Sequence, residues 1–188
     1  MSRQYWSEAL SWATADGTAV NTTTTETIIF PNVTIPANFM QDGRVLRLTA
    51  RGRWGNVITA VPTFTWAIRW GGVSGTVLAT SGAIISPAAA TTAAQWLMEA
   101  TLQTRSNGAT GTVFTMGTIT MMEDTVATFG TVANYGLVQP MASAGVITPA
   151  AVTVDLTADT ALSITIDFSA SDAANAVTGH IYILEALN

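Results

Sequence analysis

The chain has 188 residues and a mass of 19.6 kDa, and 48% of its side chains are hydrophobic, which is enough to bury the core of one domain. Charged residues make up only 10%, where an average soluble chain carries about 25%. All seven basic residues are arginine, and the formal net charge is −5. The lack of cysteine excludes disulfides and thiol chemistry, the lack of lysine excludes a Schiff base, and the acidic balance argues against nucleic-acid binding.

The first 24 residues differ from the rest, because the aromatic residues Tyr5, Trp6 and Trp12 precede the polar run NTTTT. This segment, 1–24, is typical either of an arm that docks on a neighbouring chain or of a first strand followed by a loop. No apolar stretch follows Arg3, so we expect no signal peptide and a protein made in a cytoplasm. We also expect no membrane span, because no run of about 20 predominantly apolar residues occurs.

Residues 25–188 are predicted to form a single domain of short strands. The first of these, TETIIF, stops at Pro31. In the stretches 44–54 and 63–70, apolar and polar side chains alternate, which is typical of half-buried strands. Four arginines occupy the polar positions of the alternation in these two stretches, and we expect them to face outward: Arg47, Arg51, Arg53 and Arg69.

The second half of the chain continues the pattern. The stretch 95–105 alternates and ends at a turn, whereas 111–121 has strand composition but no clear facing. Strand composition recurs at 151–156, 161–168 and 178–187. The segment Ala88 to Ala94 fits either a short helix or a loop.

These segments give eight strands, beginning near residues 26, 44, 63, 95, 111, 151, 161 and 178, and no sustained helical period. Two packed antiparallel sheets are the expected arrangement for such strands. We therefore predict an all-β antiparallel β-sandwich, as an eight-stranded jelly roll with an N-terminal arm. Eight strands favour this topology over the seven-stranded immunoglobulin type.

Few residues are candidates for chemistry. The single histidine, His180, shares the parity of Tyr182 and Leu184 and is predicted to be a packed or hydrogen-bonded structural residue. A zinc site of familiar spacing cannot be assembled without cysteine or a second histidine. Calcium could use either of two acidic pairs, neither of them in a recognised loop, so we expect no metal and no cofactor. These pairs are Glu123 with Asp124, and Asp167 with Asp172.

Three carboxylates, Glu99, Asp167 and Glu185, could lie on neighbouring strands, and a glycosidase needs two at close range. Ion pairing with the outward arginines is the favoured interpretation, because opposite charges on adjacent strands stabilise sheets. No G-x-S-x-G motif offers a serine nucleophile. We therefore predict that the protein is not an enzyme.

The six tryptophans could instead bind sugars, because exposed aromatic rings stack on them. Four of them share the parity of aliphatic neighbours and are predicted to lie in the core: Trp54, Trp66, Trp70 and Trp96. Only Trp6 and Trp12 remain as candidates for binding carbohydrate.

The surface is predicted to consist largely of Thr, Ala, Ser and Gly, with arginine but no lysine, a bias typical of protein interfaces. Four segments carry a resemblance: LTARGRWGN, PTFTWAIRWGGVSGTVLATSGAI, AAQWLMEATLQTRSNGATGTVFTMGTI and the closing LEALN. Together they resemble a group of small tailed-bacteriophage virion proteins. The resemblance implies an oligomeric β-sandwich subunit incorporated in the particle, with no active-site residues to transfer.

The leading hypothesis is a capsid decoration or cement protein of the virion, assembled in the host cytoplasm. Its expected partners are the major capsid protein or other virion proteins and copies of itself, as a homotrimer. The arm around Tyr5, Trp6 and Trp12 would bridge adjacent subunits, and the four outward arginines would face partner chains. The alternative is a tail or fibre-tip module that binds host-surface carbohydrate.

Overall fold

The computed structural model describes residues 7–57, 61–88, 90–122, 136–143 and 148–187, and these residues form an all-β structure without helices. No helix of the described residues could therefore cross a membrane. All strand pairings are antiparallel. The twelve strands are β1 (Ser7–Trp12), β2 (Thr27–Ile28), β3 (Val33–Ile35), β4 (Val45–Asn56), β5 (Thr63–Trp70), β6 (Thr76–Ile85), β7 (Thr91–Ser106), β8 (Gly111–Met121), β9 (Leu137–Ala142), β10 (Ala151–Val154), β11 (Thr160–Phe168) and β12 (Ala176–Leu187).

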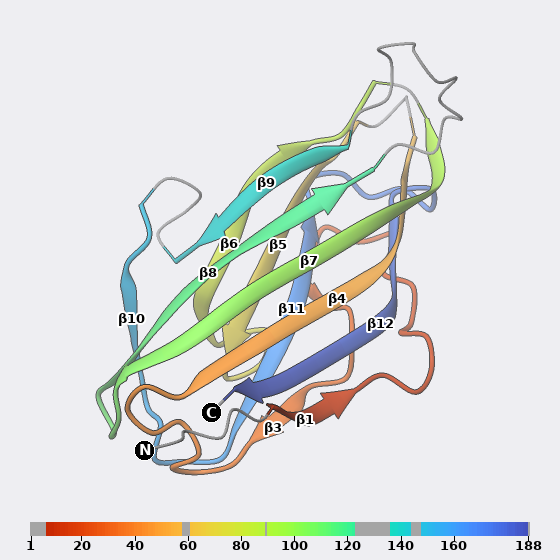
Figure 1. The fold of residues 1–188 in the computed structure, drawn as a ribbon. Coiled ribbons are helices and arrows are strands. Elements are labelled where there is room, and N and C mark those ends of the chain that lie inside the picture. The colour runs from red at the N-terminus through yellow and green to blue at the C-terminus, as the bar shows by residue number, and fades with distance from the viewer. Residues whose placement is uncertain (1–6, 58–60, 89, 123–135, 144–147, 188) are drawn as a thin grey trace, which may run out of the picture.

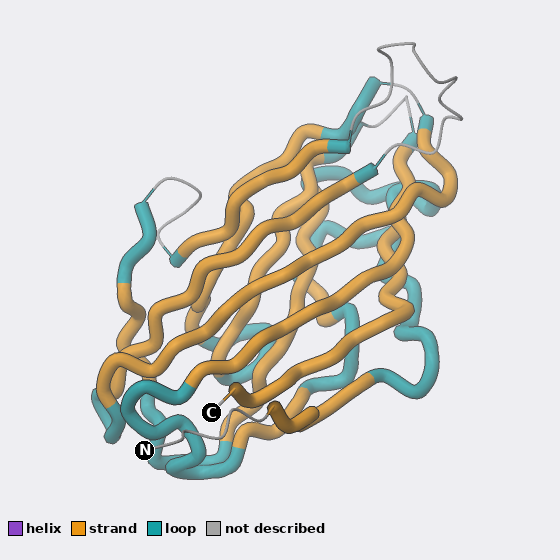
Figure 2. The backbone as a smooth tube through the Cα atoms, viewed as in Figure 1, coloured by secondary structure: helices purple, strands orange, loops and turns teal. Residues whose placement is uncertain are grey.

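The strands form one continuous sheet that folds over on itself. Its order is β1-β12-β4-β7-β8-β9-β6-β5-β11-β2, with β10 paired to β8 and β3 paired to β11. Figure 1 shows β12, β4, β7 and β8 as one layer in front of β6, β5 and β11, and Figure 2 shows the loops gathered at the ends of the layers. Strand β9 pairs with both β8 and β6 and so carries the sheet from one layer to the other. The end strands β1 and β2 consequently form its free edges.

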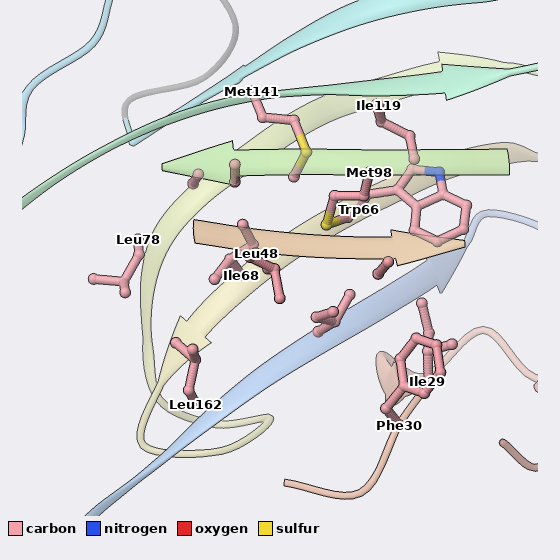
Figure 3. Packing of buried hydrophobic residues seen from close by; sticks show 14 of the residues in the cluster. Ile29, Phe30, Leu48, Trp66, Ile68, Leu78, Met98, Ile119, Met141 and Leu162 are labelled. Carbon is pink, nitrogen blue, oxygen red and sulfur yellow. The ribbon is translucent and has the colours of Figure 1, made fainter. Parts of the chain in front are cut away.

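The core lies between the two layers (Figure 3). Trp66 of β5 contacts Trp96 of β7, a strand with which β5 does not pair, at 4.7 Å between ring centroids. The rings of Trp54 of β4 and Phe64 of β5 also meet across the two layers, with 5.5 Å between their centroids. Removing such large apolar surfaces from water is the main force that holds two layers together.

The prediction of an all-β antiparallel fold is confirmed, and each of the eight predicted strands matches an observed one. The expected number of strands is wrong, since β3, β6 and β9 were not predicted and β1 was only one of two alternatives for residues 1–24, and the observed path does not establish a jelly roll. Strand β6 lacks clear alternation because its pairing with β5 contains two bulges, so its buried positions do not keep a period of two. Neither a short helix nor a loop extends from Ala88 to Ala94, because β7 already begins at Thr91.

The described part of the N-terminal segment is an edge strand. Residues of β1 pair with β12 from Ser7 opposite Leu187 to Trp12 opposite Ile183. The chain then continues beside β12, with the amide of Ala13 donating to the carbonyl of Tyr182 at 2.9 Å. Tyr5 and Trp6 lie outside the described residues.

Candidate functional site

A cleft of about 580 Å³ opens between the two free edges of the folded sheet. Residues 11–18, at and after the end of β1, form one wall, and residues 28–32, at and after β2, form the other. Backbone hydrogen bonds hold both walls: Gly17 donates to the carbonyl of Gly179, and Ile29 donates to the carbonyl of Ile164. The walls meet at Gly17, where an added Cβ would lie 2.3 Å from the carbonyl oxygen of Ile29.

Aromatic rings of Phe30 and Tyr182 line this cleft, with their centroids 5.4 Å apart. Both residues are almost fully buried, and Figure 3 shows Phe30 beside Ile29 at the margin of the core. Burial raises the pKa of Tyr182 far above its usual value, so its side chain stays neutral. The phenyl ring of Phe30 lies over Gly179, because an added Cβ there would come within 2.3 Å of that ring. The inner end of the cleft is therefore formed by packed, buried aromatic rings.

Trp12 also lines the cleft, and 59% of its surface is exposed. The other described tryptophans are at most 6% exposed, which confirms their predicted place in the core: Trp54, Trp66, Trp70 and Trp96. Large aromatic side chains usually contribute by burial, so an exposed one beside a concave surface is typical of a binding site. Trp6 and Trp12 were the two tryptophans predicted to be available for binding carbohydrate. The structure describes Trp12 of these two, and it lies at the cleft.

A chain of polar contacts fixes the charged residue of the cleft wall. Nδ1 of His180 lies 2.7 Å from a carboxylate oxygen of Asp16, and Nε of Arg53 donates to Nε2 of His180 at 3.0 Å. Because Nε2 accepts, the proton of a neutral imidazole resides on Nδ1 and is donated to Asp16. These contacts anchor Asp16 to strands β12 and β4.

The prediction that His180 is a packed or hydrogen-bonded residue is confirmed, although His180 does not face the core as Tyr182 and Leu184 do. The register between β12 and β4 shifts between Gly179 and Ile181, so His180 is the extra residue of a β-bulge. A bulge turns a side chain away from the alternation of its strand. His180 can therefore reach Asp16 while Tyr182 points into the core.

The four arginines do not share one face. Arg47, Arg51 and Arg53 lie on β4, whereas Arg69 lies on β5 in the other layer. Nη2 of Arg47 pairs with Oε2 of Glu185 at 2.7 Å across β4 and β12, so the predicted ion pairing is confirmed for this carboxylate.

One polar cluster of the β5 and β11 layer had no counterpart in the sequence patterns. Nε and Nη2 of Arg69 donate to the two carboxylate oxygens of Glu26 at 2.6 and 2.5 Å, and the Thr165 hydroxyl donates to the same carboxylate. Burial tends to raise the pKa of Glu26, but the hydrogen bonds from Arg69 and Thr165 outweigh it and hold the pKa below its usual value. Desolvation, with the charge of Glu26 second, raises the pKa of nearby Asp167.

The carboxylates considered for glycoside hydrolysis are not brought together. Glu99 on β7 and Glu185 on β12 are separated by β4, and Asp167 lies on β11 in the other layer. Among the described residues, no three His, Cys, Asp or Glu side chains gather to hold a metal ion. Asp172 instead accepts a hydrogen bond from the amide of Ala174 in a turn, while the pair at 123–124 lies outside the described residues.

Comparisons with known proteins add one weak likeness. No protein-family model matches the sequence, and no curated protein matches it. Among solved structures, the CBM2 module of the evolved Dit protein of Lactobacillus casei BL23 phage J-1 is similar with a TM-score of 0.36 and 10% identity, over 99% of this chain and 98% of that one. We draw no conclusion from a likeness of this size.

Proposed function

We propose that this protein is a non-catalytic, carbohydrate-binding module of a tailed-phage particle and that the cleft beside Trp12 is its saccharide site. The exposed ring of Trp12 at this cleft is the observation that carries the proposal. One face of a hexose ring presents C–H groups that pack on an aromatic ring, while its hydroxyls need polar partners. The phage assignment rests on the resemblance of the strand and turn segments to virion proteins.

The polar groups of the cleft suit hydroxyl recognition. Asp16 offers a carboxylate that accepts hydrogen bonds, and Asn32, Thr14 and Thr18 offer side chains that both donate and accept. A carboxylate on the wall of an acidic protein repels anionic ligands, so the expected ligand is a neutral or amino sugar rather than an acidic one.

A glycan array of bacterial surface polysaccharides, followed by calorimetric titration of the strongest signal, tests this function. Trp12→Ala is expected to weaken binding at least about tenfold, a loss of about 1.4 kcal/mol. The matched control is Ile85→Ala, because Ile85 is 75% exposed but does not line the cleft, and its binding should equal that of the wild type. Absence of any bound saccharide, or wild-type affinity in Trp12→Ala, would contradict the proposal.

The position in the particle is a separate matter. A role as head decoration stays a prediction from composition and resemblance, and so does a place in the tail. Mass spectrometry of purified particles measures the copy number, and a tail module is expected in far fewer copies than the major capsid protein. Absence from the particle would contradict both positions.

A further inference from the structure

The outer surface of the β12, β4 and β7 layer carries a small patch of unlike side chains, here called the Arg51 face: Thr49, Arg51, Leu97, Glu99 and Ile181. The strand register fixes their arrangement. Arg51 stands opposite both Ile181 of β12 and Leu97 of β7, and Thr49 stands opposite Glu99. Arg51 and Glu99 therefore occupy one diagonal of a four-residue rectangle, about 6.8 Å along the strands and about 4.8 Å across them, and Thr49 and Leu97 occupy the other.

The two charges of this face are unpaired within the chain. Neither Arg51 nor Glu99 forms an ion pair among the described residues, although both side chains are exposed. The neighbouring cations on the same strand do have partners, since Arg47 pairs with Glu185 and Arg53 donates to His180. Within the described part of the chain, the Arg51 face thus presents one cation and one anion without an ion-pair partner. They stand at diagonal positions of adjacent strands.

A two-fold axis that lies in the plane of the sheet and bisects the line from Arg51 to Glu99 at a right angle exchanges the positions of these two residues. A second copy placed by this axis sets its Glu99 against Arg51 and its Arg51 against Glu99, so both charges are compensated twice. This is the self-complementarity that an isologous contact requires. The strands of the two copies then cross at about 70°, which is closer to the orthogonal than to the aligned packing of sheets.

The same axis matches shape as well as charge. A hollow of about 470 Å³ lies beside Glu99, lined also by Thr101, Met116 and Gly117. On the strand grid, the axis brings Ile181 of the second copy to within about 3 Å of the position of Thr101, over this hollow. Ile181 is 50% exposed and supplies an apolar side chain to fill it.

We propose that the Arg51 face binds a second copy of this chain, with Ile181 of each copy seated in the hollow of the other. The occupant follows from charge complementarity, since the face offers the partner of each of its own unpaired charges. A surface that uses arginine and no lysine also has the composition of protein interfaces. This proposal predicts a two-fold pair instead of the homotrimer expected from the sequence, and it does not depend on saccharide binding.

Sedimentation velocity of the full chain over a concentration series tests the pairing. The wild type is compared with variants in which the charges of Arg51 and Glu99 are reversed. Arg51→Glu and Glu99→Arg are each expected to weaken association at least about tenfold, because each places like charges across the axis. The double variant Arg51→Glu with Glu99→Arg restores opposite charges and is expected to recover most of the affinity. Ile181→Asp should also abolish the pair, whereas Ile85→Asp, distant from the face, should not affect it.

Circular dichroism of each variant verifies that it folds. If one of the two single variants does not fold, the other still tests the pairing. A monomeric wild type at high micromolar concentration would overturn the proposal. Self-association that is unchanged in both single variants would also overturn it. So would a folded double variant that associates no more tightly than either single variant. Glycan binding retained by Arg51→Glu and pairing retained by Trp12→Ala would separate this result from that of the proposed function.

Discussion

Replacing Glu26 by glutamine is expected to lower the free energy of unfolding by about 1.5 kcal/mol near neutral pH. The carboxylate accepts two hydrogen bonds from Arg69 and one from Thr165, and the paired side chains are only 18% and 23% exposed. Exposed pairs contribute about 0–1 kcal/mol, and breaking a fully buried pair costs about 3–5 kcal/mol, so a half-buried pair should lie near 2 kcal/mol. Relief of the repulsion between Glu26 and Asp167 returns about 0.5 kcal/mol of this loss.

The loss should depend on pH in one direction. The pKa of Glu26 is lowered in the folded protein, so the stabilisation is present above the unfolded pKa of about 4.3 and disappears as the pH falls through the lower, folded value. The difference between Glu26→Gln and the wild type should therefore be constant near neutral pH and shrink in acid, below about pH 4.

Thermal and urea melts followed by circular dichroism measure this effect. For a chain of this length, 1.5 kcal/mol corresponds to a decrease in Tm of about 3–6 °C. The control is Glu8→Gln, because Glu8 is exposed on the edge strand β1 and forms no ion pair among the described residues. A Tm equal to that of the wild type, or a difference that persists unchanged into acid, would refute the reasoning.

Two further substitutions test the same structure. Asp167→Asn is expected to raise the free energy of unfolding by about 0.5 kcal/mol at neutral pH, because the raised pKa of Asp167 marks an ionised carboxylate disfavoured by desolvation and by Glu26; a urea melt that shows destabilisation would contradict this. Gly179→Ala should cost about 1–3 kcal/mol, since its Cβ would collide with the ring of Phe30. Adding Phe30→Leu should then cost less than in the wild-type background, and a strictly additive double-mutant cycle would argue against the collision.

Alternation of apolar and polar side chains was sufficient to predict the all-β class and the core tryptophans. It succeeded in β4, β5 and β7 because these strands have one face in the core, and such burial imposes a period of two on the residues themselves. It failed in β6, where bulges interrupt the register, and at His180, which is itself a bulge residue. Isolated glycines accompany these bulges, Gly82 in β6 and Gly179 beside His180, but parity counted along the sequence takes no account of the extra residue and is shifted after it.

The candidate site was only partly foreseeable. Counting the tryptophans left Trp12 without a place in the core, and the structure places it at a cleft. The sequence by itself determined the strand class, the composition of the core and the shortage of charge, because these depend on residue type and local period. The tertiary structure alone decided which charges meet, that Glu26 reaches Arg69 and that β1 and β2 border one cleft. Such contacts join residues far apart in the chain, and only the folding of the sheet at β9 brings its two ends together.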